Sequence, residues 1–164
     1  QEHGRYYTWQ TARQETAYAI DRSLCNERIG EKMKTLKQIK EEYPTLTTNG
    51  FGYYDYKGKY IGTGDITKRP KEFKAICEFL KENVTPIKTP TGPGSYGWKH
   101  IVEGNINHYI SNGMFIAAAL ACGYKMRYHK DFGPNAIFGM SLKDADRLQE
   151  TRSGGGPPLD DYDD

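Results

Sequence analysis

The residues of this chain that could take part in catalysis gather in one short stretch. His100 and Glu103 lie three positions apart, so a helix would place both side chains on one face, and imidazole and carboxylate groups are both zinc ligands. His108 lies further along, about 80° round an ideal helix from His100, and does not complete the set cleanly. The spacing leaves a metal-dependent hydrolase as a minor alternative to an ordinary surface ion pair.

Other catalytic patterns are weaker still. Cys25, Cys77 and Cys122 are far apart in the sequence, and each lies in an apolar, helix-like context that is typical of inert thiols. The glycine-rich segment lacks the serine or threonine that follows the lysine of a phosphate-binding loop. We therefore expect a non-enzymatic chain without metal, cofactor or disulfide framework, in the cytoplasm or another reducing compartment.

Tyrosine is abundant, with 13 residues in a chain of 164, and several of them lie within residues 48–65 around Lys57 and Gly58. This pattern predicts a β-hairpin in which Tyr54 and Tyr56 share one face and Gly58 takes a positive φ. Such rings could stack on nucleic-acid bases or fill a pocket of a partner. The simpler interpretation is a ribbon whose rings cover the neighbouring helices.

Two helices are predicted ahead of this hairpin and one after it. Apolar residues recur at helical spacing over residues 8–26, and again from a cap at Asn26 up to Pro44, which ends the second helix. Pro70 can open a third helix over residues 70–83. The prolines and glycines of residues 84–94 exclude regular structure and predict a linker or an extended arm.

Residues 95–142 follow a distinct order of elements. Ser95 can cap one helix, and Ser111 can open a second, strongly apolar helix that Gly123 ends. Residues 124–140 then alternate as two strands around a turn. This order resembles winged helix-turn-helix modules, and the resemblance implies contacts with nucleic acid from a helix and from the wing.

The apolar second helix, residues 114–122, is predicted to be a buried core element, because its side chains offer almost nothing to a DNA groove. The cations for phosphate contact must then come from the first helix and the wing. These basic or protonatable side chains are Lys99, His100, Lys125, Arg127, His129 and Lys130.

The chain ends in an acidic segment rich in glycine and proline. Residues 152–164 hold one cation and four carboxylates, so the rest of the chain has a net charge of +5, whereas the whole has +2. Such a tail has too little apolar surface to fold alone, and we expect a protein partner or self-assembly to hold it. The predicted partner contacts are Tyr54, Tyr56, Asp160, Asp161, Asp163 and Asp164.

These patterns predict an α+β chain, mainly helical. We expect a helical layer with a hairpin over residues 1–83, a linker over 84–94, a winged-helix-like module over 95–151 and the tail over 152–164. No stretch is long and apolar enough for a membrane helix. The predicted function is that of a small nucleic-acid-associated component of a larger assembly of a viral or mobile-element kind. A location within a virion is an alternative to the reducing compartment of a cell. The main alternative is a structural or protein-interaction subunit that binds no nucleic acid.

Overall fold

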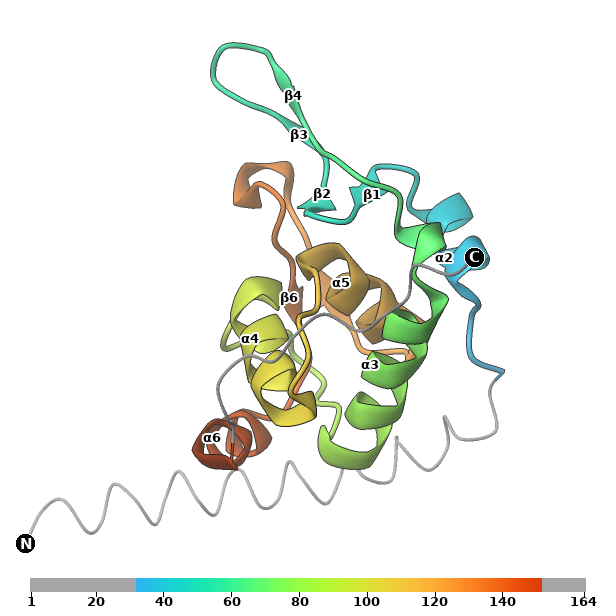
Figure 1. Cartoon of the computed structure of the whole chain (residues 1–164). Helices are drawn as coiled ribbons and strands as arrows, with labels where there is room; N and C mark the ends of the chain where they lie inside the picture. Colours follow the sequence, from blue (N-terminus) through green and yellow to red (C-terminus); the bar gives the residue numbers. More distant parts are fainter. Residues whose placement is uncertain (1–31, 152–164) are drawn as a thin grey trace, which may run out of the picture.

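The structure, a computed structural model, describes residues 32–151 and shows an α+β arrangement (Figure 1). The helices of this part are α2 (Leu36–Glu42), α3 (Pro70–Asn83), α4 (Ser95–Ile106), α5 (Asn112–Ala121) and α6 (Leu142–Thr151). Three antiparallel pairs join β1 (Leu46–Thr47) to β2 (Gly50–Phe51), β3 (Tyr53–Tyr54) to β4 (Tyr60–Ile61), and β5 (Met126–Arg127) to β6 (Ile137–Phe138). Two 3-10 helices are η1 (Ile66–Lys68) and η2 (Lys130–Phe132).

Several predictions lie outside the described residues. They are the helix over 8–26, the surroundings of Cys25, and the acidic tail with Asp160, Asp161, Asp163 and Asp164. Within the described part, no helix combines the length and the apolar character that crossing a bilayer requires.

The second helix was predicted to run from Asn26 to Pro44. For residues 32–35 this prediction is wrong, because they are not helical. Helix α2 begins at Leu36 because Thr35 and Gln38 form a capping box: the Thr35 hydroxyl accepts from the amide of Gln38, and the Gln38 side chain accepts from the amide of Thr35. The helix ends ahead of Pro44, as predicted.

Helix α3 has the bounds that the sequence predicts, with Pro70 as its first residue. Its buried face carries Phe73, Ile76 and Leu80 at helical spacing. After it, residues 84–94 form no helix and no paired strand of their own, and run antiparallel to residues 136–140 through isolated bridges at Pro86 and Gly94. This segment therefore packs along β6 and the residues that follow it.

Helix α5 is the core element of the described structure, and its predicted burial is confirmed. Residues 114–119 are completely buried, and α5 contacts α2, α3 and α4 (Figure 1). Leu120 and Cys122, which the same prediction included, are only partly buried. Ser111 caps this helix by accepting a hydrogen bond from the amide of Met114, and Gly123 follows it with a φ of 82°.

The first turn of α5 packs directly on the β1–β2 pair. A Cβ added at Gly113 would lie 1.7 Å from the carbonyl oxygen of Thr47, and the Gly113 amide donates to Thr48 O at 2.8 Å. The backbone of β1 therefore approaches the helix more closely than any side chain would allow.

We expect Gly113→Ala to lower the free energy of unfolding by roughly 1 to 3 kcal/mol, through overpacking against backbone that cannot rotate away. Helix propensity alone would make the alanine variant more stable by about 1 kcal/mol. A loss of stability would therefore identify the overpacking. Gly94→Ala is the control, because its Cβ meets nothing closer than 3.7 Å at a φ of −67°. Urea denaturation of both variants gives the comparison, and a Gly113→Ala protein as stable as the parent would contradict this packing.

The C-terminal module differs from its predicted form in two places. Ser95 is the first helical residue of α4, and its hydroxyl accepts from the amide of Ala136, so it ties the helix to the wing instead of capping it. Helix α6 was not predicted, although Leu142, Ala145 and Leu148 have helical spacing and the Ser141 hydroxyl accepts from the amide of Asp144.

Candidate nucleic-acid interface

The tyrosine-rich hairpin is confirmed, and we call residues 53–61 the tyrosine ribbon. Its two paired positions join Tyr53 to Ile61 and Tyr54 to Tyr60. The turn is held by Asp55, whose carboxylate oxygen Oδ1 accepts from the amides of Lys57 and Lys59, both at 2.9 Å. Gly58 has a φ of 75°, as predicted, and nothing lies within 4 Å of a Cβ built on it. The turn is therefore ordered by its own hydrogen bonds while standing free of the body (Figure 1).

The ribbon presents aromatic rings to solvent. The exposed fractions of Tyr54, Tyr56 and Tyr60 are 72%, 91% and 45%. Tyr54 and Tyr60 share one face because they are directly paired, and their ring centroids lie 5.4 Å apart. Tyr56 lies in the turn beyond the paired residues, so strand alternation does not determine its direction. The rings therefore do not cover neighbouring helices, which was the simpler interpretation of the sequence.

Two glycines make room for Tyr60 at the base of the ribbon. A Cβ on Gly52 would lie 1.9 Å from the Tyr60 hydroxyl oxygen, and one on Gly62 would lie 3.0 Å from it. The Tyr60 ring therefore rests on the ribbon backbone. Tyr54 packs edge-on against Tyr60, and Tyr56 lies beyond it in the turn. Tyr54 and Tyr56 are the two more exposed rings, so they are the ones that a ligand could reach from solvent.

We call residues 125–138 the wing. Strands β5 and β6 pair Met126 with Phe138 and Arg127 with Ile137, and η2 forms the tip. His129 precedes η2, and its Nδ1 accepts from the amide of Asp131 at 3.2 Å. Four of the six predicted nucleic-acid contacts are exposed on the wing, namely Lys125, Arg127, His129 and Lys130.

The β1–β2 pair, from whose end the tyrosine ribbon extends, packs on the wing. The amide of Phe51 donates to Pro134 O at 3.0 Å, and its ring centroid lies 4.2 Å from that of Tyr128. The Asn112 side-chain amide nitrogen lies 3.0 Å from both Asn49 O and Asn135 Oδ1. These contacts fix the two ribbons at the same end of the molecule (Figure 1). Burial of the Tyr128 ring in this contact raises the pKa of its phenol.

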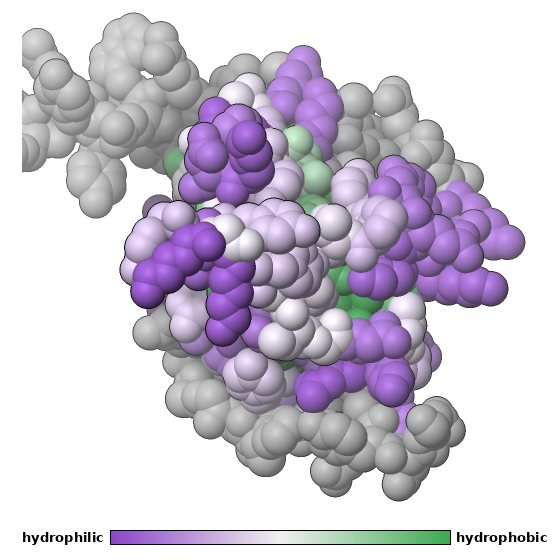
Figure 2. Space-filling model, turned by 90° about the horizontal axis from the view of Figure 1, so that it is seen from above, coloured by the Kyte–Doolittle hydropathy of each residue, from purple (hydrophilic) through white to green (hydrophobic). Residues whose placement is uncertain are grey.

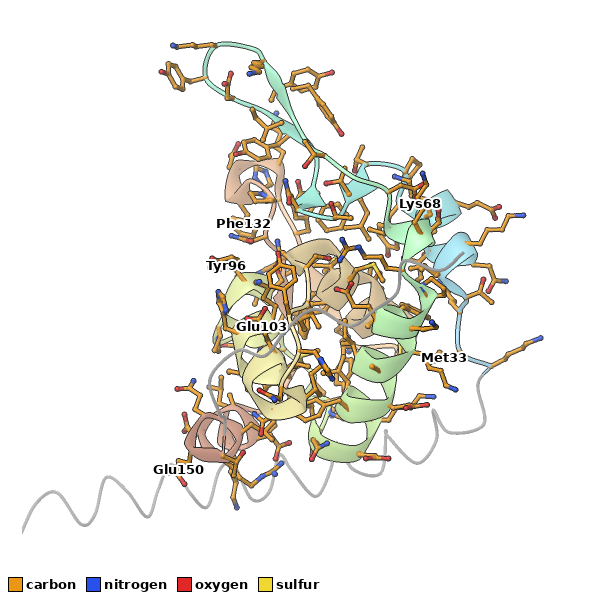
Figure 3. The ribbon with its side chains drawn as sticks, viewed as in Figure 1. Met33, Lys68, Tyr96, Glu103, Phe132 and Glu150 are labelled. Atoms are coloured by element: carbon orange, nitrogen blue, oxygen red, sulfur yellow. The ribbon has the colours of Figure 1, made fainter. Side chains whose placement is uncertain are left out.

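This end of the molecule is polar and weakly basic. The ribbon and the wing carry Lys57, Lys59, Lys125, Arg127 and Lys130 against the carboxylates of Asp55 and Asp131. The Asp55 carboxylate already accepts two hydrogen bonds within the turn. In the view from above, which faces this end of the molecule, the surface is mainly hydrophilic or of intermediate hydropathy (Figure 2). An exposed phenylalanine, Phe132, and the exposed Tyr96 of α4 lie along the same edge below the ribbon (Figure 3).

Lys99 does not belong to this surface, and the prediction that it meets phosphates does not fit its burial. Only 4% of the residue is exposed, and its Nζ lies 3.5 Å from Glu103 Oε1 and 3.0 Å from Ile110 O. The rings of Tyr109 and Tyr96 cover it, with centroids at 4.4 and 5.5 Å. The i,i+4 spacing of Lys99 and Glu103 is the sequence signal that could have indicated this pair.

The buried charges hold the turn between α4 and α5. Glu103 Oε1 accepts from the Ile110 amide at 3.2 Å, while Lys99 donates to the carbonyl of the same residue. Glu72 accepts from the amide of Ser111 at 2.8 Å. Tyr109 is part of this turn, and burial, followed by the nearby carboxylates of Glu103 and Glu72, raises the pKa of its phenol. The cluster fixes the helix-turn-helix geometry.

His100 and Glu103 are in contact, as their spacing predicts. Nδ1 of His100 lies 2.9 Å from Oε2 of Glu103, and the imidazole is partly exposed. Among the described residues, however, no group of three or more histidine, cysteine, aspartate or glutamate side chains could hold a metal ion. His108 does not complete a set with this pair. The contact is that of a histidine oriented by a carboxylate.

Comparisons with protein-family models, with curated proteins and with solved structures found no match for this chain.

Proposed function

We propose that this protein binds single-stranded nucleic acid through the tyrosine ribbon and the wing, as a component of a larger nucleic-acid assembly. The observation that carries the proposal is the pair of adjoining β-ribbons whose exposed rings and cations have no part in the core. Rings that stack on bases, next to cations that meet phosphates, are the usual means of binding unpaired strands.

Unpaired strands suit this surface better than a duplex does. Helix α5, which corresponds in order to the groove-reading helix of a winged helix, is buried, so it cannot enter a major groove. The helix-turn-helix and ribbon order of residues 95–138 supports describing the module as winged-helix-like, with contacts supplied by the wing. The bases of a single strand expose the faces on which Tyr54 and Tyr56 could stack.

The main alternative is a surface for another protein, because tyrosine is also common in protein interfaces. The cations of the wing favour nucleic acid. A protein interface also excludes charge from its centre, whereas Lys57 and Lys59 flank Tyr56 and Tyr60 at the ribbon tip. The test is binding of a fluorescein-labelled oligothymidine, followed by anisotropy at low salt. Absence of binding by the parent protein would overturn the proposal and leave the protein-interaction alternative.

Neutralising the wing should change the salt dependence of this binding. We expect the Lys125→Ala/Arg127→Ala/Lys130→Ala variant to lose up to three phosphate contacts, which would flatten the plot of log affinity against log salt by about 2 units for single strands. The control removes three exposed cations from α3 and α6, as Lys74→Ala/Lys81→Ala/Lys143→Ala. Equal slopes for the two variants would show that the wing makes no phosphate contacts.

A further inference from the structure

Two cysteines that are far apart in the sequence are neighbours in the structure. Cys77 lies on α3 and Cys122 directly follows α5, the helix against which α3 packs. The Cys122 sulfur lies 3.8 Å from the carbonyl oxygen of Cys77, and the Cys77 sulfur lies 4.0 Å from the carbonyl oxygen of Ala118. Ala118 is one helical turn before Cys122 and accepts its amide hydrogen. Each sulfur therefore contacts the backbone of the segment that carries the other cysteine.

From this reciprocal contact we infer that Cys77 and Cys122 form a reversible disulfide that links α3 to the end of α5. Both thiols are free in this structure. The sequence predicts inert thiols, and the proposed disulfide departs from that prediction for this pair.

The two thiols differ in a way that sets the order of the reaction. Cys77 is almost completely buried, with 1% exposed, whereas Cys122 is partly exposed. The neighbouring Cys77 side chain lowers the pKa of Cys122, while the neighbouring Cys122 side chain, followed by burial, raises the pKa of Cys77. Cys122 is thus the thiol that a reagent from solvent reaches first, and Cys77 is the resolving thiol.

The oxidant we propose is a low-molecular-weight disulfide such as oxidised glutathione. The Cys122 thiolate attacks one sulfur of that disulfide, the sulfur–sulfur bond of the oxidant breaks, and one half leaves as a thiolate that takes up a proton. Cys77 then gives its proton to solvent and attacks the Cys122 sulfur of the mixed disulfide, which expels the second half. The two cysteines are oxidised, and the small disulfide is reduced to two thiols.

The test uses the full chain with Cys25→Ser, so that the third thiol cannot take part. After equilibration with oxidised glutathione, intact-mass analysis should show a protein lighter by two hydrogen atoms, with no glutathione adduct and no thiol that reacts with maleimide after denaturation. Dithiothreitol should restore both thiols. The oxidised protein should also unfold at a temperature higher by on the order of 10 °C, because the cross-link restricts the unfolded chain.

Two further variants identify the roles of the two thiols. Adding Cys77→Ser should trap a stable glutathione adduct on Cys122, since the resolving thiol is gone. Adding Cys122→Ser should leave the buried Cys77 unmodified in the folded protein. The inference is overturned if the Cys25→Ser protein accumulates an adduct on Cys122 while Cys77 stays free, or if both thiols stay free at the most oxidising glutathione ratio. Neither outcome depends on nucleic-acid binding, so it leaves the proposed function untouched.

Discussion

Replacing Tyr54 and Tyr56 together by alanine should lower the affinity for an oligothymidine by at least about 30-fold. Each ring that stacks on a base contributes about 1 to 3 kcal/mol, and each 1.4 kcal/mol corresponds to about a factor of ten in affinity. Both side chains are largely exposed, and neither belongs to the buried core. The fold should therefore remain intact. Fluorescence anisotropy at one fixed salt concentration gives the affinities, and thermal unfolding checks the fold.

The matched control is Tyr54→Phe/Tyr56→Phe, which keeps both rings and removes both hydroxyls. If stacking carries the interaction, this protein should bind about as well as the parent. A phenylalanine variant as weak as the alanine variant would assign the binding to the hydroxyl groups instead. An alanine variant with unchanged affinity would remove the ribbon from the interface.

Lys99→Met should lower the free energy of unfolding by about 3 to 5 kcal/mol, because it removes the lysine cation from the buried Glu103 carboxylate and leaves it, among the described residues, only the Ile110 amide and His100 as partners. Methionine keeps the length of the apolar stem, so the change isolates the ammonium group. The Ile110 carbonyl also loses its donor, which adds to the loss. Urea denaturation followed by circular dichroism measures the difference.

The chain provides a matched pair for this experiment. Lys74 and Glu78 have the same i,i+4 spacing on α3, with Nζ and Oε1 3.8 Å apart, but their side chains are 77% and 62% exposed. Lys74→Met should therefore cost no more than about 1 kcal/mol. Equal losses in the two variants would mean that Lys99 stabilises the protein no more than a surface lysine does.

Local signals in the sequence were sufficient for much of the fold. Pro70 and the apolar spacing behind it predicted α3 to the residue, and Ser111 with Gly123 predicted α5. The start of α2 was missed because Asn26 is a good cap residue by type, while the capping box of Thr35 and Gln38 decided the boundary. Cap residues compete, and composition alone does not rank them.

The candidate site was predictable only in part, because exposure depends on tertiary packing. The ribbon and the positive φ of Gly58 followed from turn chemistry. Lys99 and Lys125 look alike as cations in the sequence, yet packing buries one under two tyrosine rings and leaves the other in solvent. Likewise, the meeting of Cys77 and Cys122 depends on how α3 packs on α5, which no local pattern encodes.

The free-standing turn of the tyrosine ribbon also determines where this protein tolerates engineering. Residues 55–59 contribute nothing to the core, and a Cβ built on Gly58 has open space around it. Lengthening a surface loop costs little closure entropy, about 0.6 kcal/mol for each doubling. The ribbon tip is thus the natural point for attaching a dye, and a dye there would lie beside the rings whose contacts it is meant to report.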